Sequence, residues 1–97
     1  MLYIINNKNS NKKEEFKFVT DKEQYKKDLP FMVKSNNVLT DMPETWKQYP
    51  MTKDGVASII NMEYKELVKA ATDEEKKCEC VHLASACLLM WRMLVNE

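Results

Sequence analysis

The stretch that decides the fold is residues 52–97, TKDGVASIINMEYKELVKAATDEEKKCECVHLASACLLMWRMLVNE. It predicts a helix over about residues 53–71, with Thr52 as its N-cap, and a second helix over about residues 73–95. Thr72-Asp73-Glu74-Glu75 matches a capping box, a hydroxyl at the N-cap with a glutamate three residues later. Because only two or three residues link the helices, they should fold back as an antiparallel hairpin.

The first of these helices carries a glutamate in the middle of its apolar face. At about 100° per residue, one broad stripe contains Val56, Ile59, Ile60, Tyr64, Leu67 and Ala70. Glu63 falls near the middle of this stripe and Glu66 at its edge. A buried unpaired carboxylate costs several kcal/mol. Glu63 should therefore be protonated, paired with a cation or bound to a metal, unless the helix lies at the rim of the fold and Glu63 reaches solvent.

The second helix is apolar almost all round. Its only polar residues after residue 80 and before Asn96 are His82, Ser85 and Arg92. Such a helix is buried on more than one side, and in a 97-residue chain we expect the extra cover to come from another subunit of a homo-oligomer. Glu79 and His82 lie one turn apart and can share an ion.

Both helices thus carry potential metal ligands three residues apart. Oxygen donors suit Mg²⁺ or Mn²⁺, and a single imidazole does not exclude these ions. Mg²⁺ usually keeps several waters and binds the phosphates of a substrate. The pattern therefore indicates phosphoanhydride chemistry, in which a metal-held water attacks phosphorus.

Glu63-x-x-Glu66, twelve intervening residues and then Glu79-x-x-His82 resemble the ExxE…ExxD pattern of the MazG-like nucleotide pyrophosphohydrolases, which are all-α NTP pyrophosphatases. The resemblance covers about residues 46–94. The stretches WKQYP (46–50) and ECVHLASACLL (79–89) are similar to short phage-type members. The resemblance implies Mg²⁺-dependent cleavage of a (deoxy)nucleoside triphosphate to monophosphate and pyrophosphate, by dimers or tetramers whose sites form near subunit contacts.

When the positions of the family motif are matched to this sequence, the resemblance implies that Glu63, Glu66 and Glu79 are the metal-binding, catalytic glutamates. His82 stands where the family has aspartate, as a further ligand or a neighbour of the ligands. Histidine removes a negative charge there, which lowers affinity for a hard divalent ion. Met62 stands where family members commonly carry another glutamate. The alternative function is a catalytically silent relative that uses the same bundle as an oligomeric binding or inhibitor module.

Three further residues are candidates for substrate binding. Trp46 could stack on a base, or could instead anchor its segment to the hairpin as an apolar side chain. Arg92 could bind a phosphate or pair with a carboxylate across a subunit interface. Lys69 is the third candidate, on the polar face of the first helix.

The cysteines suggest two other chemistries, both of which we consider weaker. In Cys78-x-Cys80-x-His82, residues two apart point about 200° away from each other, so only Cys78 and His82 could share an ion. Nothing nearby completes a tetrahedral zinc set. A Cys78–His82 nucleophile lacks an orienting third residue. We expect all three thiols to be buried as small apolar side chains.

The N-terminal part of the chain predicts less regular structure. Residues 2–5 and 15–19 are β-prone, which favours a small hairpin or a tail over residues 1–19, followed by one helical domain over residues 20–97. Thr20 is a predicted N-cap for a short helix that ends near Asp28, before Pro30. Residues 31–50 should be irregular, apart from a short helix over about residues 43–48.

Composition limits the remaining possibilities. Lys+Arg and Asp+Glu both total 15, so the net charge is zero and non-specific nucleic-acid binding is not expected. A single glycine excludes a glycine-rich nucleotide loop and favours a mainly all-α fold. The apolar run 2–5 is too short for a signal peptide or a membrane span. Three cysteines without such a signal indicate a reducing cytoplasm.

Overall fold

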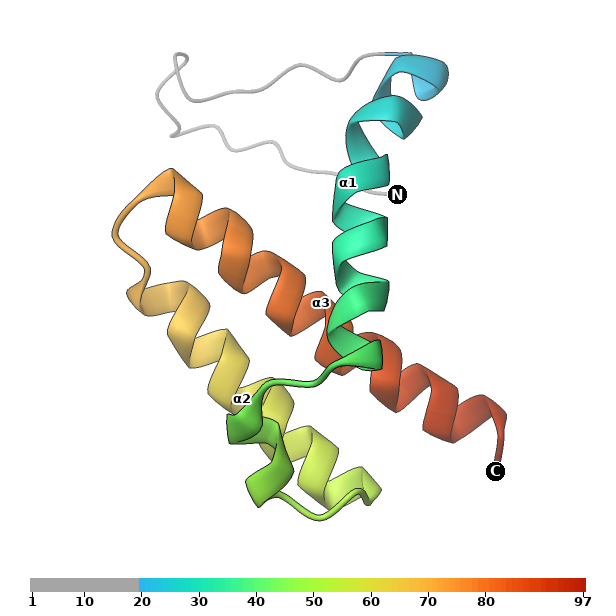
Figure 1. The fold of residues 1–97 in the computed structure, drawn as a ribbon, viewed down its shortest axis with the longest axis vertical. Helices are drawn as coiled ribbons and strands as arrows, with labels where there is room; N and C mark the ends of the chain where they lie inside the picture. Colours follow the sequence, from blue (N-terminus) through green and yellow to red (C-terminus); the bar gives the residue numbers. More distant parts are fainter. Residues whose placement is uncertain (1–19) are drawn as a thin grey trace, which may run out of the picture.

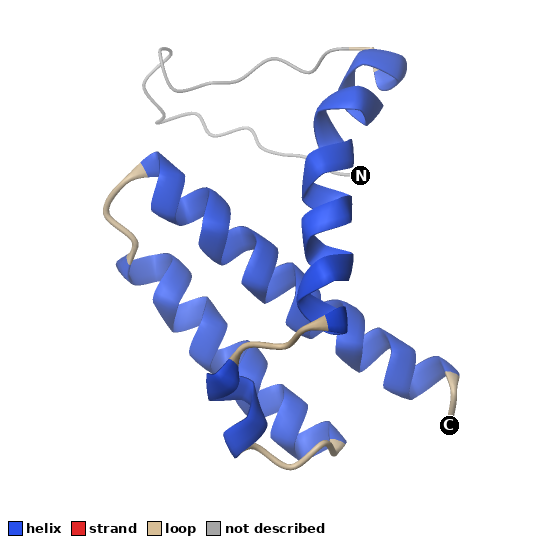
Figure 2. Ribbon diagram, in the orientation of Figure 1, coloured by secondary structure: helices blue, strands red, loops and turns tan. Residues whose placement is uncertain are grey.

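The computed structural model describes residues 20–97, and every regular element in this range is a helix (Figure 2). Three α-helices follow one another, α1 Asp21–Thr40, α2 Lys53–Lys69 and α3 Asp73–Val95, with a short 3-10 helix, η2 Glu44–Gln48, between α1 and α2. The prediction of an all-α fold is confirmed for this part of the chain. The predicted β-hairpin falls on residues 1–19, outside the described residues.

Helices α2 and α3 lie side by side and antiparallel, joined by three residues (Figure 1). Thr52 Oγ1 accepts a hydrogen bond from the Gly55 amide at 3.1 Å, so the predicted cap of α2 is confirmed. The capping box of α3 is also confirmed. Glu75 Oε1 accepts from the amides of Ala71, at 2.9 Å, and Thr72, at 3.2 Å. These two amides lower the pKa of the Glu75 carboxyl.

Helix α1 is longer than the sequence predicted. It begins at the expected cap, Thr20, but continues past Asp28 and through Pro30 for ten further residues. Proline removes one helical N–H and costs about 3 kcal/mol in a helix interior, so the second half of α1 needs support from elsewhere. A contact with α3 supplies part of it, because the Ser85 hydroxyl, which lies 2.6 Å from the backbone oxygen of Val81, also lies 3.1 Å from the backbone oxygen of Ser35 and shares its one proton between them. The predicted short helix over residues 43–48 is present as η2.

The C-terminal end of α1 meets α3 near the middle of that helix, while the first turns of α1 extend away from the hairpin (Figure 1). A small core closes where η2 lies against the hairpin. Trp46 of η2, Ile59 of α2 and Ala86 of α3 form its centre, and each is fully buried. Val56, also of α2, is fully buried as well. Because η2 contributes the largest of these side chains, this short segment is part of the core.

The single glycine of the chain lies where two backbone segments approach closely. Gly55 is buried in the first turn of α2, and a Cβ atom there would collide with the backbone oxygen of Pro50. Pro50 belongs to the link between η2 and α2. The absence of a side chain at Gly55 therefore lets this link pack directly on α2.

Much apolar surface remains uncovered in residues 20–97. Large exposed apolar side chains occur on all three α-helices, among them Tyr25, Leu29, Met32 and Val33 on α1, Tyr64 and Val68 on α2, and Trp91, Leu94 and Val95 on α3. Tyr64 was expected within the buried stripe, but it lies 100° around α2 from Glu63 and outside the face that meets α3. Helix α3 is long and apolar enough to cross a membrane by length and composition alone, and little of its most apolar stretch is buried.

Candidate metal centre

Helix α2 directs Glu63 toward the small core. The residue is only 4% exposed, as its position in the apolar stripe predicted. Its Oε2 accepts a hydrogen bond from Nε1 of Trp46 at 2.7 Å. Trp46 has no exposed surface, so this hydrogen bond is shielded from water. A hydrogen bond to a carboxylate in such surroundings is strong, and it holds the Glu63 carboxylate in one orientation.

The other oxygen of Glu63 faces the imidazole of His82 on α3. Oε1 of Glu63 lies 3.8 Å from Nδ1 of His82, and Oε1 of Glu79 lies 3.3 Å from the same nitrogen. Two carboxylates from different helices thus converge on one side chain. Spacing alone suggested that Glu79 and His82 are neighbours. Their approach to Glu63 depends on how α2 packs against α3.

Glu66 does not join this group. It is exposed on α2, and among residues 20–97 it has no side-chain hydrogen bond or ion pair. Glu66 follows Glu63 by three residues, so its side chain points about 60° away from that of Glu63 around the helix axis. This rotation places Glu66 at the edge of the face that meets α3. Within one chain, the sequence-derived set of four ligands is therefore reduced to Glu63, Glu79 and His82.

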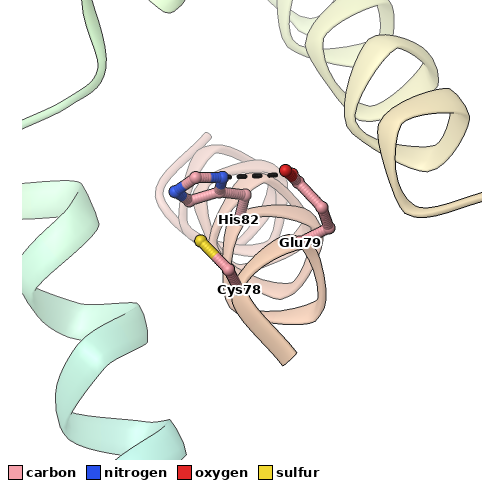
Figure 3. Close-up of side chains that lie close together, drawn as sticks. All are labelled: Cys78, Glu79 and His82. Atoms are coloured by element: carbon pink, nitrogen blue, oxygen red, sulfur yellow. Dashed lines mark hydrogen bonds and ion pairs between the residues drawn. The ribbon is translucent and has the colours of Figure 1, made fainter. Parts of the chain in front are cut away.

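A thiol completes a second grouping on α3. Ligand atoms of Cys78, Glu79 and His82 all lie within 4.8 Å of one another. Figure 3 shows the three side chains gathered on one side of the helix, with the Cys78 sulfur beside the imidazole and Glu79 at its Nδ1. The expectation of buried thiols is wrong, because Cys78, Cys80 and Cys87 are all exposed. An apolar pattern does not distinguish a thiol that faces the core from one that faces solvent.

An open groove of about 1110 Å³ lies between α1 and the N-terminal half of α3. Cys78 and His82 form part of its wall. The groove is also lined by four lysines and two acids, Lys27, Lys34, Lys76, Lys77, Asp73 and Glu74. Sequence reasoning missed this feature because it ended α1 before Lys34. The signal in the sequence would have been the spacing of Lys27 and Lys34, because residues seven apart on one continuous helix share a face.

The three predicted substrate-binding residues lie apart from one another. Trp46 is buried against Glu63, so neither face of its ring is open to a base, and it acts as the hydrophobic anchor that the sequence also allowed. Arg92 is exposed and donates to Oδ1 of Asn36 at 3.1 Å. It lies ten residues from His82, about 15 Å along α3. Lys69 is exposed in the last turn of α2.

The donor atoms of this centre fit divalent cations of two kinds. The carboxylates of Glu63 and Glu79 are hard oxygen donors suited to Mg²⁺ or Mn²⁺. The imidazole of His82 and the thiol of Cys78 are softer donors that suit later first-row metals. The two donor types meet at His82, which both groupings share.

Comparison with known proteins identified no relative, since no family model, curated protein or solved structure matches this chain.

Proposed function

We propose that this chain is a MazG-like hydrolase, which cleaves a (deoxy)nucleoside triphosphate to the monophosphate and pyrophosphate with Mg²⁺ or Mn²⁺. The observation that carries the proposal is the convergence of Glu63 and Glu79, from two different helices, on the imidazole of His82. A buried carboxylate that faces a second carboxylate across two helices is expensive to maintain for stability alone. A divalent cation compensates for both charges.

Each residue of the centre has a distinct part in this proposal. Glu63 and Glu79 would hold the cation, and the bound ion would neutralise charge on the phosphates and activate a water. Trp46 keeps one oxygen of Glu63 occupied, so that the other oxygen points toward His82. His82 holds a place between the two carboxylates and can pass a proton to or from either of them.

The groove between α1 and α3 is the candidate site for a polyphosphate substrate, and His82 is the residue of the proposed centre that lines it, whereas Glu63 and Glu79 do not. Its volume of about 1110 Å³ is ample for a nucleoside triphosphate. Two of its lysines come from each helix, and the Lys77 ammonium already pairs with Glu74 at 3.3 Å. Lys27 and Lys34 of α1 form no side-chain ion pair within residues 20–97, so they are the better candidates to bind phosphate oxygens as point charges.

We also propose that the active form is a cytoplasmic homo-oligomer. Within residues 20–97 only four apolar side chains are fully buried, whereas Trp91, Leu94 and Val95 are exposed together at the end of α3. Contiguous exposed apolar surface of this kind marks association sites. A second copy of the chain would cover this surface.

A second function is favoured by the details of the centre. Trp46 occupies one Glu63 oxygen, Glu66 lies outside the group, and His82 replaces the aspartate of the ExxD motif. All three features reduce the negative charge available to a hard cation. They favour a catalytically silent relative, in which the same buried network only stabilises an oligomeric binding or inhibitor module.

Pyrophosphate release from a panel of dNTPs and NTPs, with Mg²⁺ or Mn²⁺, separates the two functions. The enzyme should turn over at least one substrate, and Glu63→Gln should abolish turnover while leaving the circular dichroism spectrum intact. Glu44→Gln is the matched control, because Glu44 is exposed on η2 and pairs only with Lys47 in residues 20–97. No turnover with any substrate, together with no metal-dependent rise in Tm, would remove the hydrolase proposal.

A further inference from the structure

The thiol of Cys78 has no part in the proposed hydrolysis, although it lies in the same group of side chains as His82. Its sulfur, a Glu79 oxygen and a His82 nitrogen all lie within 4.8 Å of one another. The three residues come from one turn of α3, a helix that is capped at its start and spans 23 residues. Their backbone positions are therefore fixed relative to one another, and only side-chain torsions adjust the separation of the donors.

We infer that Cys78, Glu79 and His82 form a binding site for a thiophilic divalent cation of the Zn²⁺ class. Zinc binds thiolate sulfur at about 2.3 Å, imidazole nitrogen at about 2.0–2.1 Å and carboxylate oxygen at about 2.0–2.2 Å. Tetrahedral ligands at such distances lie roughly 3.4–3.6 Å from each other. Glu79 Oε1 and His82 Nδ1 are already 3.3 Å apart, so the pair needs almost no rearrangement to share an ion.

Two neighbouring residues, Glu63 and Cys80, differ in their relation to this site. Glu63 Oε1 lies 3.8 Å from the same nitrogen of His82, and Trp46 holds the carboxylate in place. Because it faces Nδ1, the nitrogen that would bind the ion, and not Nε2, this carboxylate would place a further negative charge beside the cation, unlike the outer-shell carboxylates that bind the opposite nitrogen of a zinc-bound histidine. Cys80 lines the same groove as Cys78 and His82, but its sulfur does not belong to the group of donors that lie within 4.8 Å of one another.

The site would keep an open coordination position. Three protein ligands leave the fourth position of zinc for water or another small ligand, as in catalytic rather than structural zinc sites. Cys78 and His82 both line the groove between α1 and α3, so this open position is reached from solvent. Because Glu79 and His82 also belong to the proposed Mg²⁺ centre, zinc would compete with Mg²⁺ for them.

This inference does not depend on hydrolysis, since it concerns binding of the ion alone. The test uses the full chain with Co²⁺ as the probe, because a cobalt ion bound by a thiolate gives an intense sulfur-to-metal charge-transfer absorption that Mg²⁺ sites lack. We expect one Co²⁺ per chain with this absorption, and its loss when one equivalent of Zn²⁺ is added.

Three variants identify the thiol ligand. Cys78→Ser should abolish the charge-transfer absorption and weaken Zn²⁺ binding by more than the roughly 10–100-fold that loss of an outer-shell partner causes. Cys80→Ser is the matched control, an exposed thiol on the same helix, and should change neither. A Cys80→Ser/Cys87→Ser double variant, which retains only Cys78, should still bind one ion per chain.

Four outcomes would overturn the inference. They are no thiolate absorption with Co²⁺, absorption that survives Cys78→Ser, absorption that is lost in Cys80→Ser, and a stoichiometry of one ion per two chains that disappears in the double variant. The last result would assign binding to thiols of different molecules. Hydrolysis that fails while the cobalt absorption is present would remove the proposed function and leave this site.

Discussion

The hydrogen bond between Trp46 and Glu63, which lie 17 positions apart, should couple the effects of mutations at these two residues on the free energy of unfolding. Trp46→Phe keeps most of the buried ring but removes the N–H that faces the carboxylate. A hydrogen bond to a charged group contributes roughly 1.5–3 kcal/mol, and the smaller ring leaves a cavity that adds to the loss. We expect this variant to lose about 2–4 kcal/mol of unfolding free energy.

A double-mutant cycle separates the hydrogen bond from the cavity. Glu63→Met has similar length but no acceptor, so it leaves the indole N–H buried without a partner, which costs roughly 1–3 kcal/mol. In the double variant neither polar partner remains. The double variant should therefore lose less unfolding free energy than the sum of the losses of the two single variants, by about 1.5–3 kcal/mol.

The assay is urea unfolding followed by far-ultraviolet circular dichroism at pH 7. Protein concentration must be fixed, because association would shift the apparent stability. The exposed pair Lys47–Glu44, 2.7 Å apart, is the control and should show much weaker coupling, since solvent screens it. If the losses at Trp46 and Glu63 add to within about 0.5 kcal/mol, the buried hydrogen bond does not hold the carboxylate and the account of the centre is wrong.

Four further predictions concern single positions. His82→Asp adds the fourth carboxylate of the ExxE…ExxD motif and should lower the Kd for Mg²⁺ by about tenfold, measured by calorimetry; an unchanged Kd would contradict the proposed centre. The pKa of Glu75 is lowered in the fold by the Ala71 and Thr72 amides, so its cap stabilises the chain fully above pH 4.5 and is lost as the pH falls below that value toward the folded pKa. Glu75→Gln should accordingly flatten the acid side of the stability–pH curve, and an unaltered acid side would refute this. Trp91→Glu places a charge on the exposed end of α3 and should lower the mass measured by light scattering, whereas an unchanged mass would place the subunit contact elsewhere. Pro30→Ala should raise the stability of the fold by up to about 3 kcal/mol, and an equal or lower Tm would show that Pro30 is needed where it stands.

The parts of the fold that sequence predicts well are those in which local signals agree with packing. Thr52 and Thr72 mark the starts of α2 and α3 because a cap is a contact within four residues, visible in the sequence itself. The course of α1 through Pro30 could not be read in the same way. The proline signal is local, but the second half of α1 is held partly by Ser85, which lies 50 positions away from its partner Ser35.

In the candidate site, too, the features that depend on a single helix were predicted and those that depend on contacts between elements were not. Glu63 was recognised because a charge in an apolar stripe is anomalous within a single helix. The hydrogen bond from Trp46 was not, because nothing in the sequence indicates that the indole N–H of a residue in η2 reaches a carboxylate of α2. The pair Cys78 and His82 was considered as zinc ligands but given little weight because a four-ligand set was required, although three protein ligands, with Glu79 as the third, suffice for an open site.

Gly55 affects this centre although it is not one of its residues. The glycine sets how closely the segment after η2 can lie on α2, and η2 carries Trp46, which in turn fixes Glu63. An alanine at position 55 would push the Pro50 backbone outward and, through it, withdraw the indole donor from the buried carboxylate. The orientation of a candidate metal ligand is thus controlled from a distance by the one residue of the chain that has no side chain.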